Sequence, residues 1–185
     1  MKKIITIARS YGSGGKEIGK ALAKSLGINY YGREIFEMTQ GNGDNLYAGD
    51  DESIHQSTFE KSDELFKLQS AKIKEIAEHE SCVIVGRCAD YVLRDMDYVT
   101  RVYLYAPLRE RMRRVIRLYE LNPDDAKSLI HSMDKTRGDY YFHNTGLVWS
   151  DPNHYNLCIN TAGLDTKKCI EIIKHYIDIR YPDSI

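Results

Sequence analysis

The segment from Ile4 to Leu26 constrains the fold more than any other part of this chain. It begins with an apolar run, passes through a loop that holds three glycines, and continues as an amphipathic helix. A strand, a glycine-rich turn and a helix in this order bring several backbone N–H groups and the positive end of a helix to one point. Glycines in such a turn permit close backbone approach and positive φ angles. The segment therefore predicts a phosphate-binding loop.

Lys16 directly follows Gly15, where the motif G-x-x-x-x-G-K-[ST] places its phosphate-binding lysine. Two positions depart from the motif. Ser10 replaces the first glycine, and Glu17 replaces the hydroxyl residue that normally reaches Mg²⁺. Glu17 indicates either a carboxylate that takes the metal itself or a weaker nucleotide site. A turn that caps a helix and binds nothing is the alternative interpretation.

Composition limits the remaining possibilities. At 185 residues the chain is expected to form a single domain, and a net charge of −1 predicts no general attraction to nucleic acids. No C-x-x-C pair and no membrane-length apolar run occur, and the N-terminus is too short for a signal peptide. We therefore expect a cytoplasmic protein, a monomer or homodimer, without a membrane partner or a dedicated metal site. Four cysteines are predicted to be reduced and mostly buried: Cys82, Cys88, Cys158 and Cys169.

Apolar runs alternate with helical patterns along the rest of the chain. Strands are predicted at residues 4–8, 28–31, 82–86, 99–105 and 157–160, and the main helices at residues 16–26, 59–79, 107–119, 122–141 and after Asp165. Pro107 is expected in the first helical turn. The last helix is expected to bury Cys169, Ile172, Ile173 and Tyr176. This alternation predicts a five-stranded parallel sheet in an α/β fold with helices on both faces.

Charged residues follow the first three predicted strands. In parallel sheets, ligands lie beyond the carboxyl ends of the strands. The three strand exits carry Lys16, Arg33, and Arg87 with Asp90. Together they predict an anion-binding site, although a solvated arginine remains the alternative for each cation taken alone.

Five arginines lie within residues 109–117. Arg109, Arg113 and Arg117 recur every four residues and are expected to form an exposed stripe. Arg111 and Arg114 lie nearer the apolar face and are better placed to point into a site. A nucleic-acid patch is disfavoured because the chain is nearly neutral and no aromatic residues are interleaved. A plain solvated helix face stays open.

Asp134 and Arg137 lie three residues apart on one predicted helix. The carboxylate can hold a sugar hydroxyl while the guanidinium grips a phosphate in a bidentate fork. A simple intrahelical ion pair is the alternative. The aromatic segment 140–149 follows, and it predicts core packing more than base stacking.

With these motifs the chain resembles the cytidylate kinase-like branch of the P-loop nucleoside monophosphate kinases. The resemblance rests on residues 13–19, the strand exit at residues 83–90, the Arg111/Arg114 helix, Asp134 with Arg137, and residues 140–149. It implies a P-loop NTPase fold and an enzyme that moves the γ-phosphoryl group of ATP, with Mg²⁺, to a small phosphorylated acceptor. A nucleoside monophosphate such as CMP is the first candidate.

The resemblance also implies roles for individual residues. ATP phosphates would be cradled by Gly12, Ser13, Gly14, Gly15, Lys16 and Glu17. Lys16 would neutralise charge on the transferred group, and Arg111 and Arg114 would close over the phosphates from a lid at about residues 107–140. The acceptor phosphate would be held by Arg33, Arg87 and Arg137. The acceptor sugar or base would contact Asp134 and, less surely, Asp90.

Departures from the family pattern fall on the acceptor side. Cys88 follows Arg87 where the pattern has aspartate, and a Gly/Asn/Asp-rich stretch at about residues 40–58, expected to be a mobile acceptor-side segment, replaces the usual helical insert. The identity of the acceptor is therefore left open. Two further hypotheses stay open as well: a nucleotide-binding regulatory protein without catalysis, and a binding module for non-nucleotide anions.

Overall fold

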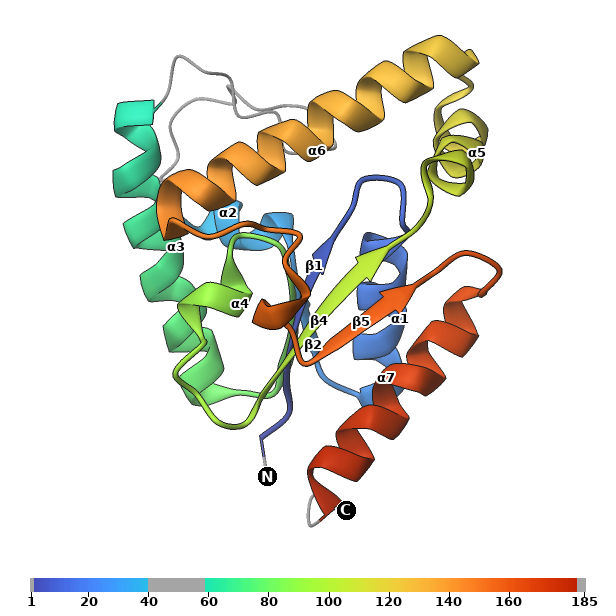
Figure 1. Cartoon of the computed structure of the whole chain (residues 1–185). Helices are drawn as coiled ribbons and strands as arrows, with labels where there is room; N and C mark the ends of the chain where they lie inside the picture. Colours follow the sequence, from blue (N-terminus) through green and yellow to red (C-terminus); the bar gives the residue numbers. More distant parts are fainter. Residues whose placement is uncertain (1, 40–58, 183–185) are drawn as a thin grey trace.

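A five-stranded parallel sheet organises the structure, a computed structural model that describes residues 2–39 and 59–182. The strands are β1 (Ile4–Arg9), β2 (Asn29–Tyr31), β3 (Cys82–Val85), β4 (Val99–Tyr105) and β5 (Leu157–Asn160). Their order across the sheet is β2-β3-β1-β4-β5, and every neighbouring pair is parallel (Figure 1). The parallel sheet expected from the sequence is confirmed.

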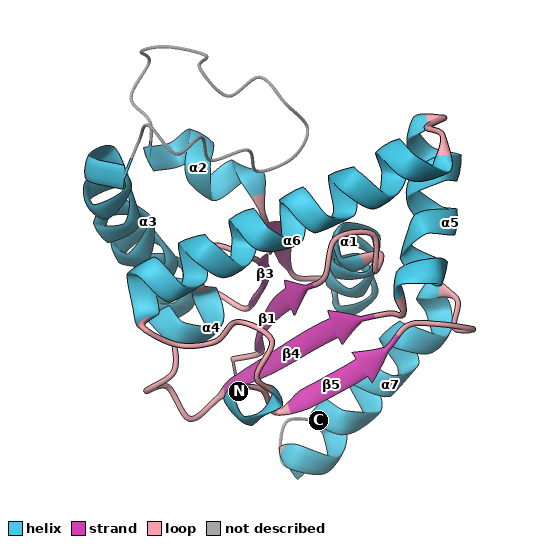
Figure 2. Cartoon of the chain, turned by 45° about the horizontal axis from the view of Figure 1, so that its top comes forward, coloured by secondary structure: helices cyan, strands magenta, loops and turns pink. Residues whose placement is uncertain are grey.

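Helices cover both faces of this sheet. On one face lie α1 (Gly15–Leu26) and α7 (Thr166–Arg180), and on the other lie α2 (Arg33–Thr39), α3 (Phe59–His79) and α4 (Ala89–Val92). The remaining pair, α5 (Leu108–Tyr119) and α6 (Pro123–Thr145), packs together, and α6 crosses the carboxyl ends of the strands (Figures 1 and 2). The carboxyl edge of the sheet is thus walled by α6.

Alternation along β1 divides the core into two layers. Ile5 and Ile7 face α1 and α7, whereas Ile4 faces α3 and α4. All three side chains are at most 1% exposed. Burial on both faces explains why the strand is a nearly continuous apolar run. A third cluster joins Tyr11, which follows β1, to α5 and α6.

Several helix boundaries agree with local sequence signals. Gly27 ends α1 in the left-handed conformation at φ 64°. Asn122 and Asp165 cap α6 and α7 by accepting hydrogen bonds from the backbone N–H groups of Asp125 and Lys168, at 2.9 and 2.8 Å.

Other expectations from the sequence need correction. Pro107 is the residue before α5 and not part of its first turn. Helix α6 continues to Thr145, four residues beyond the predicted end, and a short 3₁₀ helix at Pro152–His154 was not predicted. In α7, Ile172 is 38% exposed, and Ile177 is buried in its place.

The remaining expectations concern the cysteines, the membrane and residues 40–58. Cys82, Cys88 and Cys169 are buried, and Cys158 is exposed. Among the described residues, no helix combines the length and apolar character needed to cross a membrane. The segment expected to be mobile, at about residues 40–58, lies outside the described residues.

Gly19 allows α1 to pack closely on β3. A Cβ atom at this position would lie 2.6 Å from Cγ2 of Val85. We expect Gly19→Ala to lower the free energy of unfolding by about 1–3 kcal/mol because the core becomes overpacked. Gly138 lies within α6 with nothing within 4 Å of such a Cβ, so Gly138→Ala should raise stability by about 0.5–1 kcal/mol. Urea unfolding of the two variants measures this contrast, and equal stability of Gly19→Ala and wild type would contradict it.

Candidate active site

The phosphate loop, residues 10–16, turns sharply between β1 and α1. Gly12 and Gly14 adopt positive φ angles of 78° and 88°. The backbone N–H and the hydroxyl of Ser13 both donate to the carbonyl of Ser10, at 3.2 and 2.8 Å. Thr161, directly after β5, donates its hydroxyl to the Ser13 carbonyl at 3.0 Å. The turn is therefore held in shape by its own residues and by the end of β5.

Small residues are required in this loop because other groups approach it closely. A Cβ on Gly15 would lie 2.6 Å from Cγ of Arg9, and one on Gly14 would lie 3.0 Å from Nη1 of Arg114. Lys16 and Glu17 follow as exposed residues in the first turn of α1. This arrangement of strand, left-handed glycines and helix N-terminus is suited to binding a phosphate chain.

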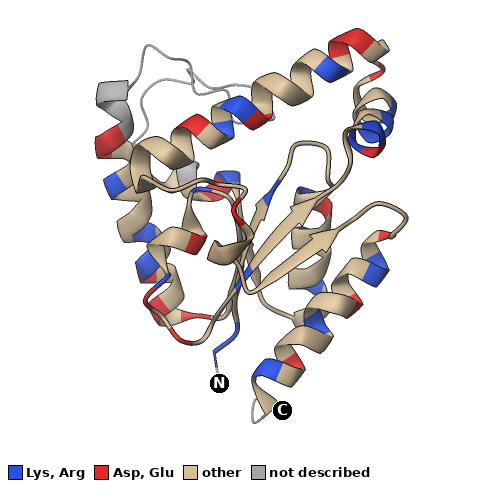
Figure 3. Cartoon of the chain, in the orientation of Figure 1, with Lys and Arg blue, Asp and Glu red and all other residues tan. Residues whose placement is uncertain are grey.

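Basic residues are concentrated on helix α5 (Figure 3), and their exposure divides the arginines into two sets. As the spacing predicts, Arg109, Arg113 and Arg117 are exposed, whereas Arg111 and Arg114 are partly buried. Arg114 donates to the carbonyl of Gly12 at 3.0 Å. The two partly buried guanidinium groups are therefore on the side of α5 that faces the phosphate loop.

Arg111 makes three contacts, two with backbone carbonyls and one with a carboxylate. Its Nε donates to the carbonyl of Ala106 at 3.0 Å, and its Nη1 donates to the carbonyl of Tyr11 at 3.2 Å. The same Nη1 lies 2.5 Å from Oδ2 of Asp134. Arg111 therefore contacts both α6, through Asp134, and the phosphate loop, through Tyr11.

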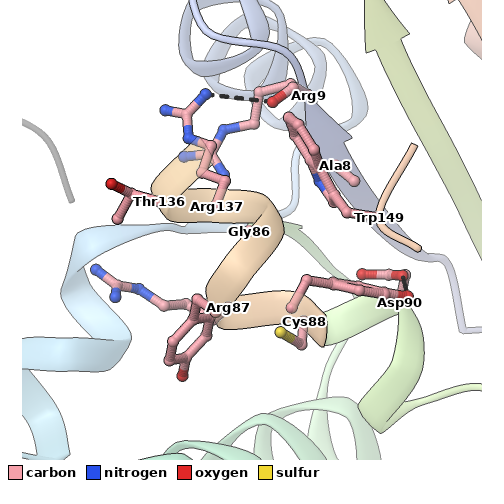
Figure 4. A pocket seen from close by; sticks show the side chains of 11 residues that line it. Ala8, Arg9, Gly86, Arg87, Cys88, Asp90, Thr136, Arg137 and Trp149 are labelled. Carbon is pink, nitrogen blue, oxygen red and sulfur yellow. Dashed lines mark hydrogen bonds between the residues drawn. The ribbon is translucent and has the colours of Figure 1, made fainter. Parts of the chain in front are cut away.

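A second feature, the α6 pocket, lies beside the loop at the carboxyl ends of β1 and β3 (Figure 4). It encloses about 480 Å³, including the part open to solvent. Its walls come from the end of β1, the turn between β3 and α4, α6, and the segment after α6. They are formed by Ala8, Arg9, Gly86, Arg87, Cys88, Asp90, Thr136, Arg137, Tyr140, Tyr141 and Trp149.

Three guanidinium groups give the α6 pocket a cationic character. They belong to Arg9, Arg87 and Arg137. Arg137 donates to the carbonyl of Arg9 at 3.2 Å (Figure 4). Its guanidinium also lies over the ring of Tyr11, 5.1 Å from the ring centroid. Arg87 and Cys88 both have positive φ angles, 59° and 54°, which turn the chain sharply out of β3. The pocket is suited to an anionic ligand.

Asp90 is the acidic residue of this pocket. It is 5% exposed and accepts a hydrogen bond from the hydroxyl of Tyr141 at 2.7 Å. Burial raises the pKa of its carboxyl group above the ordinary value, while the bond from Tyr141 acts in the opposite direction. The buried pair joins α4 to α6 at the floor of the pocket.

A raised pKa for Asp90 has a definite consequence for stability. Since the folded protein holds the Asp90 proton more tightly than the unfolded chain, this residue contributes stability at low pH that is lost as pH rises through the folded pKa. The neutral variant Asp90→Asn has no such loss. We therefore expect the melting temperature of Asp90→Asn, relative to wild type, to rise as the pH is raised above the ordinary pKa of an aspartate. Melting curves at several pH values measure this slope, and a constant difference would contradict the expectation.

The structure distributes the residues that the sequence grouped together over two adjoining features and α2. Lys16 lies at the phosphate loop, whereas Arg87, Asp90 and Arg137 line the α6 pocket. Arg33 is exposed at the start of α2 and is not among the lining residues. Asp134 accepts a hydrogen bond from the backbone N–H of Tyr11 at 2.7 Å and pairs with Arg111.

Sequence reasoning missed several residues of the site. Arg9 and Thr161 stand at the ends of β1 and β5, so their positions at the carboxyl edge were an available signal. Thr136 carried no such signal, since it lines the pocket only because α6 crosses that edge (Figure 2). Tyr140 belongs to the aromatic segment 140–149, for which core packing was favoured over base stacking, and it lines the pocket together with Tyr141 and Trp149.

A known protein family accounts for most of this chain, including the residues of the site. A sequence model of the cytidylate kinase-like family matches residues 4–163, which include the phosphate loop, the arginines of α5 and the α6 pocket. The chain belongs to the cytidylate kinase-like family. The family resemblance seen in the sequence is thereby confirmed.

Similar proteins of known name agree with this membership. A cytidylate kinase from Thermococcus sibiricus is 28% identical over 183 residues, which cover 98% of this chain and 91% of that protein. A cytidylate kinase from Thermococcus kodakarensis matches with the same identity and coverage. One from Methanopyrus kandleri is 25% identical over 185 residues, covering 95% of this chain and 93% of that protein.

Solved structures of other proteins share the fold of this member of the cytidylate kinase-like family. An uncharacterized protein from Eubacterium ventriosum superposes with a TM-score of 0.80 at 27% identity, covering 96% of this chain and 99% of that one. A shikimate kinase from Bacteroides thetaiotaomicron superposes with a TM-score of 0.59 at 17% identity, covering 95% and 98%. The second likeness concerns the fold alone.

Proposed function

We propose that this protein transfers the γ-phosphoryl group of ATP to a small phosphorylated acceptor, with CMP as the first candidate. The observation that carries the proposal is the phosphate loop, whose left-handed glycines and helix N-terminus lie beside a pocket lined by three arginines. Membership of the cytidylate kinase-like family supports nucleotide kinase activity. The names of the relatives support CMP, although identity of 28% leaves the acceptor to be tested.

In the proposed mechanism the phosphate loop binds the donor. Backbone N–H groups of the loop other than that of Ser13, together with the N-terminus of α1, would hold the β and γ phosphates, and Lys16 would neutralise charge on the transferred group. Arg114, which already contacts the Gly12 carbonyl, would stabilise negative charge that spreads over the phosphates. Positioning and charge stabilisation suffice for such a transfer, so no dedicated base among the site residues is required.

On the acceptor side, the α6 pocket would hold the phosphate that receives the transferred group. Arg87 and Arg137 lie on opposite walls, on the turn after β3 and on α6. Guanidinium forks on two sides of a phosphate fix its orientation as well as its charge. The rings of Tyr140 and Trp149 would contact the rest of the acceptor.

Mg²⁺ is the expected companion of ATP, and Glu17 fits its requirements. The carboxylate of Glu17 is exposed in the first turn of α1, next to Lys16, and Mg²⁺ prefers oxygen ligands, often one carboxylate together with substrate phosphates. Within residues 2–39 and 59–182, no cluster of three or more His, Cys, Asp or Glu side chains forms a separate metal site. The metal would neutralise charge on the β and γ phosphates.

A coupled assay of ADP release across a panel of nucleoside monophosphates tests the proposal. ADP release that depends on CMP, and is weaker with UMP, AMP and GMP, is the expected result. Binding of ATP without acceptor-dependent ADP release would instead support a regulatory nucleotide-binding protein. Ser10 and Glu17, which depart from the motif, favour that second function. No change of melting temperature with ATP and Mg²⁺ would overturn both.

A further inference from the structure

Asp134 links helix α6 to the phosphate loop. Its Oδ1 accepts the backbone N–H of Tyr11 at 2.7 Å, and its Oδ2 lies 2.5 Å from Nη1 of Arg111. The side chains of Arg111 and Asp134 are only 14% and 24% exposed. Hydrogen bonds to a partly buried carboxylate are stronger than those between neutral groups, so these contacts hold three segments of the chain together.

Tyr11 is the point at which the loop is held. Its ring is 5% exposed and packs with Val115, Ala126, Ile130 and Met133 from α5 and α6. Its carbonyl accepts a bond from Arg111, so its N–H, its carbonyl and its ring are all engaged. Gly12, the next residue, begins the left-handed part of the turn, where a Cβ would lie 3.0 Å from Cγ2 of Val115. The start of the phosphate loop is therefore positioned by the pair of helices α5 and α6.

We propose that Asp134 is a positioning residue that holds the phosphate loop and Arg111 in register with α6, and that it is not a ligand of the acceptor. This inference rests on the proposed function. Asp134 is not among the residues that line the α6 pocket, whereas Arg137 and Tyr141, three and seven residues later on α6, line it. Residues at this spacing share one face of a helix. A single helix thus aligns the donor loop through Asp134 and contacts the acceptor through Arg137.

The proposal separates donor effects from acceptor effects. Without the Asp134 carboxylate, the Tyr11 N–H and the Arg111 guanidinium lose a shared partner, and the loop is less well ordered before nucleotide binds. ADP affinity and turnover then fall because ordering the loop draws on binding energy. The KM for the acceptor stays unchanged, since Asp134 makes no contact in its pocket.

Three variants test this separation. Asp134→Ala removes both contacts, Asp134→Asn keeps an oxygen for Tyr11 but removes the charge opposite Arg111, and Asp139→Asn is the control. Asp139 lies on the same helix, and its side chain is 54% exposed. Among the described residues, its only ion pair is with Lys135, one turn earlier on α6. We expect Asp134→Ala to weaken MgADP binding, measured by calorimetry without acceptor, by about tenfold or more. Asp134→Asn should be intermediate, Asp139→Asn should match wild type, and the KM for CMP should change less than twofold throughout.

A raised KM for CMP with unchanged ADP affinity in Asp134→Asn would overturn the proposal and make Asp134 an acceptor ligand. The backbone amide of Tyr11 supplies a readout that needs no nucleotide. Its hydrogen exchange, followed by NMR, should be about tenfold faster in Asp134→Ala than in Asp139→Asn. If wild type fails to bind ADP, the proposed function fails, while faster exchange still supports the role of Asp134. Unchanged exchange in Asp134→Ala overturns that role, and Asp134→Asn gives the same comparison if the alanine variant does not fold.

Discussion

Replacing Lys16 with alanine is expected to reduce phosphoryl transfer by about 10³-fold or more without changing the melting temperature. Lys16 is exposed in the first turn of α1, directly after Gly15, so its side chain adds a positive charge where the helix N-terminus and the loop N–H groups meet. In the proposed mechanism this positive charge neutralises the negative charge of the phosphoryl group during its transfer. Removing an exposed side chain leaves packing intact, so the loss should be confined to activity.

Lys24 provides a matched control for this experiment. It is exposed on the same helix but lies in the last turn, at the opposite end from the phosphate loop. Lys24→Ala should retain wild-type turnover and wild-type ATP affinity. The measurement is steady-state ADP release with the best acceptor from the panel, together with thermal melting of both variants. Wild-type turnover in Lys16→Ala would rule out the phosphate loop as the donor site.

Most of the fold was predictable because its signals are local. The strands are short apolar runs buried on both faces, and helix ends carry residues such as Gly27 and Asp165 whose capping roles depend on adjacent backbone groups. Where burial depends on a distant partner, local patterns were insufficient. Ile172 and Ile177 both fit an apolar face of α7, but only contact with the sheet and α1 decides that Ile177 is the buried one.

The site was predictable to a smaller extent. Motif spacing predicted the glycine turn between β1 and α1, and the four-residue period of α5 correctly separated exposed arginines from partly buried ones. Side-chain partners were not predictable, because they depend on how α5 and α6 pack. From its spacing to Arg137, Asp134 was expected to hold an acceptor sugar hydroxyl or to form an intrahelical ion pair. The sequence carried no signal of the contact between its carboxylate and Arg111, 23 residues earlier in the chain. The cytidylate kinase-like pattern predicts which residues gather at the site, and the tertiary structure decides which of them contact each other.

Arg114 carries the second large expected effect. Its guanidinium donates to the Gly12 carbonyl at 3.0 Å, and its Nη1 atom would lie 3.0 Å from a Cβ atom placed on Gly14. The Arg114 side chain therefore covers the part of the loop that is proposed to hold the β and γ phosphates. We expect Arg114→Ala to lower kcat by about 10²–10³-fold, since a preorganised cation is then absent where charge develops. Arg114→Lys should recover part of the loss, because an ammonium group restores charge without the planar fork.

Arg113 is the natural control for Arg114. It is the adjacent residue, its side chain is 60% exposed, and it pairs with Glu110 on the same helix, away from the loop. Arg113→Ala should leave kcat and the KM for ATP unchanged. Steady-state kinetics, combined with calorimetric MgADP affinity, distinguish two roles for Arg114. A transition-state role lowers kcat much more than ADP affinity, whereas a role confined to holding the loop would lower both together. Equal losses of affinity and turnover in Arg114→Ala would therefore assign Arg114 to the shape of the loop and remove it from the chemistry of transfer.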